Sequence, residues 1–596
     1  MSLPKLNLIR SPGNLAQSAT KRFLSVPQCL KPSRPTEFRT TSMHRCLLIS
    51  EVFCLVLEFI RQYDELPEDG ECKEGHKLGT RTLASLARTC RAFSSPALDL
   101  LWMRLDSLDP LIKLLPTRIW AKKHSRFVIR MFLGDKHELT FRQYAVRVQY
   151  LHGPCRGILP SVQRNVFTAL ARLPGVSLPL LPNLTELVWN ESDSRSVVDP
   201  TVSLLKYFAG PRVTTVSLFL MTWPIYASTR TVLADLPNLC PNVTSFTAVP
   251  RAIFNDYSQD VGEVVNKWPS LRVLRSCQLS QAIMDELASR AILNALSIEL
   301  NSFITDVYLD KLPATVHTFS LEGSDTLCCL RYLQTLQGTP SHLRLRVDLD
   351  LALPPDMDAL FRMLPTRFDT TWLRSLMISS KPSYRCVRTL RSFSLTEPLL
   401  ASLYPFSMLV TLDLNAFSTS KLDDVAYERM AATWPGLRSL KLGTADVSRA
   451  PPRASVGAVI AMLRSCPYLE TLHIVLDGSI PPPPPMVMSD VDRDTQHGEL
   501  AGSDEEGTER TTMSQGCTWG ISNQCITQIH VGHSPVVRHM ERLNDLVLCL
   551  RSVLPRLRRI QSKKEAVEMS DIFDMAESEG WLTVQRLLVE KDMTCI

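Results

Sequence analysis

The chain has 596 residues with 45% apolar and 21% charged side chains, the composition of a folded globular protein rather than a disordered or fibrous one. Its 66 basic and 60 acidic residues leave a net charge of +6, too small to indicate binding of polyanions over the whole surface. The most apolar segment, residues 46–60, contains two acids and is shorter than the roughly 20 residues that span a bilayer, so we expect no membrane partner. The 16 cysteines form no C-x-x-C pair and follow no secretory signal, which favours reduced, mostly buried thiols.

The first 42 residues contain many basic residues, Ser and Pro, a single acid at Glu37, and no sustained apolar face, so we expect a disordered tail. The same bias suits a mitochondrial presequence, but five prolines oppose the amphipathic helix that such a signal forms. We therefore favour a cytoplasmic or nuclear protein, with Met43 as an alternative start site to Met1. The basic residues of this tail are Lys5, Arg10, Lys21, Arg22, Lys31, Arg34 and Arg39.

The next segment shows helical spacing of apolar side chains in three pieces, which predicts a small three-helix domain. The pieces run from Leu48 to Ile60, from Leu83 to Phe93 and, after a break near Pro96, from Leu98 to Leu105. A polar, glycine-containing segment, residues 63–79, separates the first two pieces and predicts a loop. Helices this short are not stable alone, so they must pack on one another and present their remaining apolar surface to something else.

From residue 181 a short apolar pattern recurs along the chain. The segment Pro182 to Trp189 has the form P-x-L-x-x-L-x-L, with Trp in the last apolar place. The copies at 184, 213, 243 and 271 lie 29, 30 and 28 residues apart, a period at the long end of the range of leucine-rich repeats. Further copies start at Leu293, Val316, Leu373, Leu409, Leu437, Leu469, Ile526 and Leu557, and an alternating stretch runs from Leu343 to Leu349.

This repeat predicts a fold as well as a period. The L-x-L centre is a short strand whose side chains alternate between core and solvent, and the following residues return as a helix to the next strand. Prolines end two of these helices, at Trp434-Pro435 and Cys466-Pro467, just before the next strand begins. We predict an α/β horseshoe-shaped solenoid of parallel strands with outer helices, preceded by a small helical head.

Two segments near the repeats carry unbalanced charge. The segment before them includes Arg118, Lys122, Lys123 and Arg126 and is expected to link the head to the array or to form first irregular repeats. A proline-rich, acidic segment near residue 500 cannot bury a core and is expected to be disordered. The predicted parts are a tail (1–42), a helical domain (43–106), a linker or irregular repeats (107–180), repeats (181–477), a disordered insertion (478–520), final repeats (521–562) and a helical cap (563–596).

The sequence offers little support for an enzyme. It contains no G-x-x-x-x-G-K-S/T, G-x-S-x-G or H-E-x-x-H motif, so a phosphate-binding loop, a nucleophile elbow and a zinc helix are not indicated. His530, His533 and His539 cluster, and Cys72 precedes His76 by four residues, but no second ligand pair stands at a zinc-site spacing. We expect neither a metal nor a cofactor, and no catalytic residue.

The first helical piece begins with Leu48-Ile49-Ser50-Glu51 and continues with the apolar Val52, Leu55 and Val56. In this the three-helix segment resembles the F-box, the adaptor-binding domain of ubiquitin-ligase substrate receptors. That family has Leu-Pro-x-Glu at this place, and Ile49 stands here instead of the usual Pro. An F-box before a leucine-rich array is similar to the F-box receptors that are abundant in mushroom-forming fungi. The residues that match the family and, by this resemblance, bind the adaptor are Leu48, Ile49, Glu51, Val52, Leu55, Val56, Leu86, Cys90, Phe93 and Trp102.

The resemblance implies a non-catalytic scaffold. Its head would bind the S-phase-kinase-associated adaptor, and through it a cullin and a RING subunit, while the array would hold a protein substrate. The outward strand positions are the candidates for substrate binding, and their mixed charge favours a protein over a nucleic acid: Glu186, Ser217, Arg275, Glu299, Glu322, Asp413, Lys441 and His473. The alternative is an interaction scaffold without ligase partners, in which residues 48–105 cap the array. The receptor hypothesis predicts an exposed apolar patch around Leu48, Val52 and Trp102, and the scaffold hypothesis predicts that this region is buried.

Overall fold

The computed structural model describes the chain in two compact units, Met1–Leu100 and Leu101–Ile596. The predicted tail, Met43, Leu48, residues 63–77 of the predicted loop and residues 485–518 of the predicted insertion lie outside the described residues. The described residues are 49–62, 78–123, 126–131, 133–152, 164–173, 177–190, 201–220, 227–250, 258–290, 292–300, 309–349, 352–380, 393–445, 450–484, 519–536, 539–562 and 572–590.

Three helices make up the described residues of the first unit. These are α2 (Ser50–Gln62), α3 (Leu78–Leu86) and α4 (Arg91–Met103), whose last three residues belong to the second unit. The rings of Phe53 and Phe93 stack at 4.1 Å and join α2 to α4. The buried apolar side chains of this unit are Phe53, Leu57, Leu83, Phe93 and Ala97.

The predicted helix break at Pro96 is wrong. The chain leaves helical structure between α3 and α4, and the carbonyl of Cys90 then accepts a hydrogen bond from the Ser94 amide at 3.1 Å as α4 begins. Pro96 lies inside α4, where its missing N–H removes one backbone hydrogen bond. Burial of Phe93 and Ala97 on either side offsets that loss, because tertiary packing stabilises a short helix more than its intrinsic propensity does.

The second unit contains a parallel sheet in which each strand pairs with its neighbour in the chain, except that the β2–β3 hairpin stands apart. The strands of the 15-stranded sheet are β1 (Arg104–Leu105), β4 (Tyr150–His152), β5 (Glu186–Asn190), β6 (Thr215–Leu220), β7 (Ser245–Pro250), β8 (Val273–Cys277), β9 (Ala295–Glu299), β10 (Thr318–Glu322), β11 (His342–Val347), β12 (Ser375–Ser380), β13 (Thr411–Leu414), β14 (Ser439–Leu442), β15 (Thr471–His473), β16 (Gln528–Gly532) and β17 (Arg559–Ser562). The separate hairpin is β2 (Trp120–Lys123) and β3 (Arg126–Ile129), which pair antiparallel.

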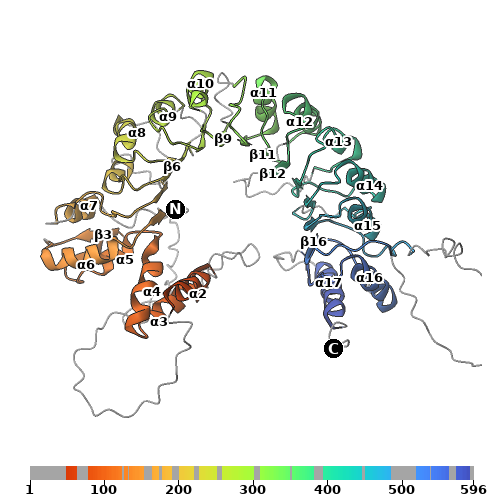
Figure 1. The fold of residues 1–596 in the computed structure, drawn as a ribbon, viewed down its shortest axis with the longest axis horizontal. Helices are drawn as coiled ribbons and strands as arrows, with labels where there is room; N and C mark the ends of the chain where they lie inside the picture. The colour runs from red at the N-terminus through yellow and green to blue at the C-terminus, as the bar shows by residue number, and fades with distance from the viewer. Residues whose placement is uncertain are drawn as a thin grey trace, which may run out of the picture. The chain divides into compact units, whose positions relative to one another are not determined.

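Helices return the chain from one strand to the next, and α8 to α15 lie along one side of the curved sheet of this unit (Figure 1). The arrangement is that of a solenoid-like repeat of strand and helix, as predicted. The helices are α5 (Asp109–Lys113), α6 (Asp135–Ala145), α7 (Arg164–Ala171), the 3₁₀-helix η2 (Thr201–Tyr207), α8 (Ala227–Leu239), α9 (Ser258–Val265), α10 (Gln281–Ser289), α11 (Thr326–Thr335), α12 (Pro354–Arg367), α13 (Glu397–Ala401), α14 (Asp424–Thr433), α15 (Val456–Ser465), α16 (Met540–Val553) and α17 (Ile572–Glu590).

The core of the array is a row of apolar side chains, one from each strand in register. Leu274 pairs with Leu296, which pairs with Phe319, and all three are buried. The row runs through the sheet as Leu105, Leu151, Leu187, Val216, Phe246, Leu274, Leu296, Phe319, Leu343, Leu376, Leu412, Leu440, Leu472, Ile529 and Ile560. Each such side chain contributes about 1.5–3 kcal/mol on burial, so the row makes a large contribution to stability.

The sheet begins before residue 181, next to and within the segment 107–180 that was predicted to be a linker or first irregular repeats. β1 lies just before this segment and pairs with β4 inside it, and β4 pairs with β5, so both strands belong to the array. These strands have two and three residues, and the β2–β3 hairpin is inserted between them. The short strands and the hairpin hide the period of 28 residues, so the repeat is visible in the sequence only from residue 181.

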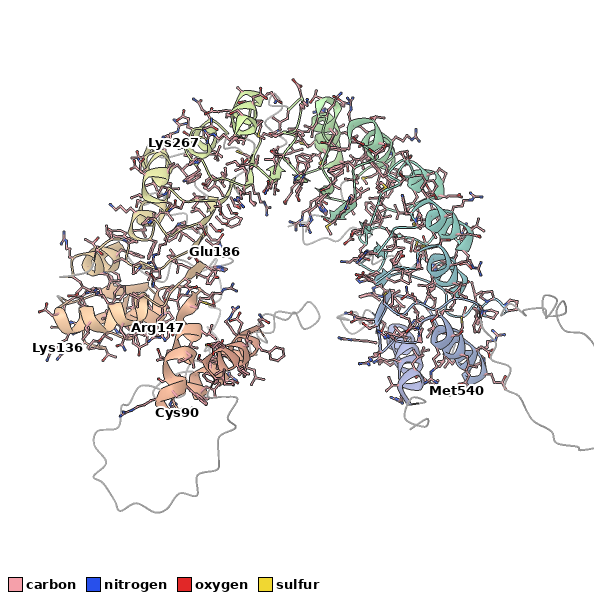
Figure 2. The ribbon with its side chains drawn as sticks, in the orientation of Figure 1. Cys90, Lys136, Arg147, Glu186, Lys267 and Met540 are labelled. Carbon is pink, nitrogen blue, oxygen red and sulfur yellow. The ribbon has the colours of Figure 1, made fainter. Side chains whose placement is uncertain are left out.

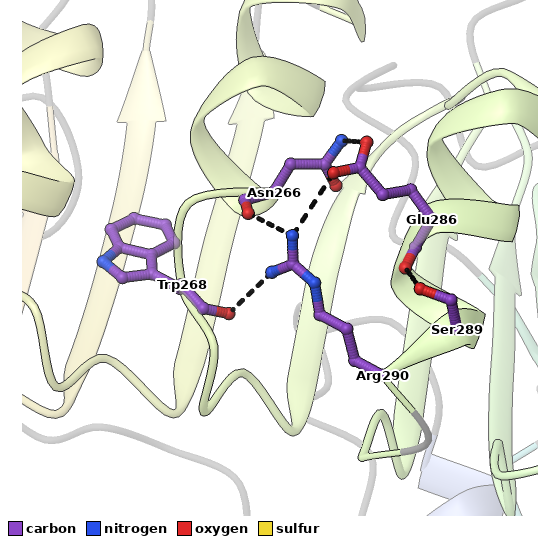
Figure 3. Close-up of polar contacts among 5 residues, drawn as sticks. All are labelled: Asn266, Trp268, Glu286, Ser289 and Arg290. Atoms are coloured by element: carbon purple, nitrogen blue, oxygen red, sulfur yellow. Dashed lines mark hydrogen bonds and ion pairs between the residues drawn. The ribbon is translucent and has the colours of Figure 1, made fainter.

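Polar side chains also join successive repeats at the turns before the strands. The indole Nε1 of Trp268 donates to the carbonyl of Cys240 at 2.8 Å, and the thiol of Cys466 lies 3.3 Å from the carbonyl of Trp434. All four residues precede a proline in equivalent positions of their repeats. Figure 3 shows a related join, in which Arg290 donates to the carbonyls of Asn266 and Trp268.

The array continues across the predicted insertion and ends in the predicted cap. β15 pairs with β16 in register although 54 residues separate His473 from the start of β16, and the indole of Trp519 donates to the carbonyl of Pro483 at 2.9 Å. The C-terminal helix α17 buries Trp581, whose Nε1 donates to the carbonyl of Ser534 at 2.8 Å. The cap therefore covers the apolar end that the last repeat would otherwise expose.

Candidate functional site

The first candidate surface is one face of α2. Helical spacing places Val52, Leu55, Val56 and Phe59 on the same side of this helix, because they stand three, four and seven residues apart. Leu55 is 71% exposed, Phe59 69% and Val56 40%, while Val52 is half-buried. Ile49, just before the helix, is 50% exposed. Exposed apolar side chains gathered on one helix face are typical of a protein interface.

The other residues that were predicted to bind an adaptor are spread over the core and the surface. Phe93 is buried on Phe53, Leu86 is half-buried, and Cys90 and Glu51 are exposed. Hydrogen bonds from its own backbone N–H and from the Ser50 hydroxyl lower the pKa of the Glu51 carboxyl below its usual value. Leu48 lies outside the described residues.

The exposed patch differs in its residues from the one expected around Leu48, Val52 and Trp102. Trp102 does not take part, because it is half-buried and packs on Tyr144 at 4.7 Å within the core of the second unit. Phe59 was missing from the predicted site, although its place four residues after Leu55 was a signal for it. The patch is therefore formed by Ile49, Leu55, Val56 and Phe59, which we call the α2 face.

The second candidate surface is the side of the sheet opposite the core row. All eight residues that were predicted to contact a substrate stand at positions that alternate with the buried row. Ser217, Arg275, Asp413, Lys441 and His473 share one register position, Glu186 stands two residues before it, and Glu299 and Glu322 two residues after it. Figure 2 shows Glu186 on this side of the sheet, away from the helices.

In the middle of this surface the charged residues pair with one another. Arg275 on β8 lies 2.9 Å from the carboxylate of Glu322 on β10 and 3.8 Å from that of Glu299 on β9. Arg346 on β11 lies 3.6 Å from the same Glu322 carboxylate. Glu322 keeps only 9% of its side chain exposed, so two cations surround a nearly buried anion. The four charges balance, and they form one network across four strands.

Two further pairs lie toward the ends of the sheet. Glu186 on β5 contacts Nε2 of His152 on β4 at 3.1 Å. His152 lies in the segment that was predicted to be a linker or first irregular repeats. Asp413 on β13 lies 3.6 Å from the ammonium of Lys441 on β14. Ser217 is half-buried in β6 between these regions. The surface thus offers paired charges and hydroxyls rather than a stripe of one sign.

A histidine pair stands next to Lys441. The rings of His473 on β15 and His530 on β16 stack at 4.9 Å with an interplanar angle of 23°. Nδ1 of His473 lies 3.3 Å from the hydroxyl of Thr444. Burial, followed by the nearby His530 and Lys441, lowers the pKa of His473 to about 4, so its imidazole is neutral at neutral pH.

The described residues hold no group of three or more His, Cys, Asp or Glu side chains placed to bind a metal ion. His530 belongs to a strand rather than to a metal cluster, and His539 stands at the start of α16. Among the described helices, none combines the length and apolar character needed to cross a bilayer. Of the described cysteines, Cys240, Cys277, Cys329, Cys466 and Cys549 are buried, and burial raises the pKa of the Cys240 and Cys466 thiols to about 11.

No family model matches the chain, and no curated protein matches it. The chemistry of the two surfaces indicates what each can bind. The α2 face offers aliphatic and aromatic side chains to a partner, and the open side of the sheet offers hydrogen-bonding and charged groups over many strands. Both are suited to holding other molecules in place.

Proposed function

We propose that the protein is a non-catalytic F-box receptor of a cullin–RING ubiquitin ligase, in which the helical unit binds the adaptor and a leucine-rich-repeat array binds a protein substrate. The observation that carries this proposal is the α2 face. Leu55 and Phe59 remain about 70% exposed on a helix that already buries Phe53 and Leu57 on its other side. A helix with two apolar faces, one packed and one open, needs a partner for the second.

The surface of the sheet supports the substrate-binding half of the proposal. Its register positions place Arg275, Asp413, Lys441 and their neighbours in one continuous row over successive strands. Paired charges and hydroxyls of this kind recognise a protein surface by complementary hydrogen bonds, and they add specificity more than affinity. The function would follow from proximity: a receptor raises the effective concentration of its substrate near a conjugating enzyme that other subunits carry.

The test is binding of the full-length chain to the purified S-phase-kinase-associated adaptor. We expect a complex that co-elutes in gel filtration, and we expect the double variant Leu55→Asp, Phe59→Asp to abolish it. Met540→Asp is the matched control, because Met540 is an exposed apolar side chain at the start of α16, 54% accessible, far along the chain from α2 (Figure 2).

Three outcomes would contradict the proposal. The wild-type chain fails to bind while its circular dichroism shows a folded protein; the double variant binds as well as the wild type; or both variants lose binding equally. The first outcome would favour the alternative function, an interaction scaffold that works without a ligase. In that alternative, residues 48–105 cap the array, and only the surface of the sheet binds other proteins.

A further inference from the structure

The N-terminal end of the array carries a strong excess of positive charge that the proposed function does not use. Between residues 110 and 185 the chain has 12 basic residues and 2 acids, an excess of +10, whereas the whole chain has a net charge of only +6. The acids are Asp135 and Glu138, and the basic residues are Lys113, Arg118, Lys122, Lys123, Arg126, Arg130, Lys136, Arg142, Arg147, Arg156, Arg164 and Arg172.

The fold gathers a large share of these residues around the β2–β3 hairpin. The ammonium groups of Lys113 on α5 and Lys122 on β2 both lie over the ring of Phe127, at 5.8 and 4.9 Å from its centre. The amide of Arg130 donates to the carbonyl of Ile119 at 2.7 Å, which places Arg130 beside Arg118 at the open end of the hairpin. Two cations on one aromatic ring repel each other unless an anion approaches.

The cations of this region are exposed and largely unpaired. Within the described part of the chain, no carboxylate forms an ion pair with Lys113, Arg118, Lys122, Lys123, Arg130 or Lys136. The only ion pair of α6 found there joins Arg142 to Glu138 at 3.2 Å. Lys136 lies on the exposed side of α6 (Figure 2). Lys122 and Lys123 follow each other in β2 and so point to the two sides of the hairpin. We call the region that carries these six cations the basic surface.

Exposed aliphatic side chains accompany the basic surface. Leu139 is 74% exposed, Met131 54% and Val146 40%. Helical spacing aligns Lys136, Leu139, Arg142 and Val146 along one side of α6 and its last turn. Aromatic rings are held inside: Trp120 is half-buried, donates its Nε1 to the carbonyl of Leu115 at 3.0 Å and packs on Phe127.

We propose that the basic surface binds a partner protein through a segment that combines acidic and aliphatic side chains. The carboxylates of such a segment would reach the unpaired ammonium and guanidinium groups, and its aliphatic side chains would cover Leu139, Met131 and Val146. A nucleic acid would satisfy the cations but not the aliphatic side chains, and the inward-turned Trp120 provides no platform for stacking bases.

The probe is a fluorescent peptide of about 20 residues with the repeat Glu-Glu-Leu, titrated with the full-length protein and followed by anisotropy. The variant Arg118→Glu, Lys123→Glu, Lys136→Glu should weaken binding at least about tenfold, because it replaces attraction by repulsion at three sites. The matched control is Lys267→Glu, Arg464→Glu, Arg542→Glu, which makes the same change of net charge at exposed cations of other repeats and should bind as the wild type does. Thermal unfolding confirms that both variants fold.

Binding of other probes to the same protein distinguishes between the possible classes of partner. A Glu-only peptide should bind the wild type more weakly than the Glu-Glu-Leu peptide, and Leu139→Asn should remove that difference. The proposal is overturned if the two triple variants bind the peptide equally, if the wild type does not bind it at low salt, or if duplex DNA, single-stranded RNA or phosphatidylserine vesicles bind more tightly than the peptide does.

Discussion

His473 illustrates how the sheet sets the properties of a single side chain. Sequence placed it at an outward position, but the periodicity says nothing of what stands beside it on the next strand. There the ring of His530 stacks on it, and Lys441 lies on the strand before. Burial and these two basic neighbours lower its pKa from 6.5 to about 4, so the folded protein favours the neutral imidazole.

This pKa shift makes stability depend on pH. Between pH 6.5 and 4 the unfolded chain binds a proton at His473 that the folded chain does not. The contribution of His473 to the free energy of unfolding is therefore fully present above pH 6.5 and is lost as the pH falls through this window. After allowance for solvent screening at a half-buried site, we expect the free energy of unfolding to fall by about 1–2 kcal/mol from this residue. His473→Asn should flatten the decrease, measured by urea unfolding at several pH values.

The control for this prediction is His342→Asn, because His342 is an exposed histidine at the start of β11. It should leave the pH dependence as in the wild type. If His473→Asn and His342→Asn give the same decrease between pH 6.5 and 4, His473 does not titrate as its surroundings indicate.

At the scale of elements, the repeats are held together by their buried apolar residues and by side-chain hydrogen bonds of two residues that precede a proline, Trp268 and Cys466. The leucine pattern predicted the strands from β5 to β17 because one apolar residue per strand must enter the core. It could not predict β1, β4 or the β2–β3 hairpin, since strands of two or three residues carry no period. The leucine pattern could not predict the side-chain hydrogen bonds either, because these bonds depend on which residues of two successive repeats come into contact.

Trp268 and Trp434 test the value of such a bond. Both are fully buried before a proline, but Trp268 donates to the carbonyl of Cys240, while the Nε1 of Trp434 has no partner within the described residues. Trp268→Phe should therefore lower the free energy of unfolding by about 1–2 kcal/mol more than Trp434→Phe, because only the first leaves a buried carbonyl without its donor. Urea unfolding followed by circular dichroism measures the difference.

Each variant serves as the control for the other, since both exchange an indole for a phenyl ring against an aromatic neighbour, Phe246 or Tyr404. Equal losses for the two variants would mean that the volume of the ring, and not its hydrogen bond, decides the stability. The sequence gives both residues the same X-Pro context, so only the structure separates them.

At the scale of the molecule, one continuous sheet is formed although a long acidic segment of the chain lies between two of its neighbouring strands. The acidic segment predicted near residue 500 interrupts the chain between β15 and β16, yet the register of the strands passes across the interruption. Asn523 makes this possible: its side-chain amide donates to the carbonyls of Pro467 and Leu469, and its Oδ1 accepts from the amides of Cys525 and Ile526. One buried asparagine thus ties the returning chain to the preceding repeat.

The array should therefore tolerate loss of the segment but not loss of its anchor. Replacing residues 485–518 (34 residues) by a Gly-Ser linker of about six should leave β15 and β16 paired, because Pro483 and Trp519 already hold the two ends together at 2.9 Å. The shorter loop costs less entropy to close, by up to about 1.5 kcal/mol, so the variant should be at least as stable as the wild type. The midpoint of urea unfolding measures this.

The matched control adds Asn523→Ala to the same replacement. This substitution removes the four side-chain hydrogen bonds of the anchor but keeps Trp519, and it should lower the midpoint clearly, since buried backbone groups lose their partners. A loss of stability from the replacement alone, or no loss from the added Asn523→Ala, would contradict the view that Asn523 carries the register across the insertion.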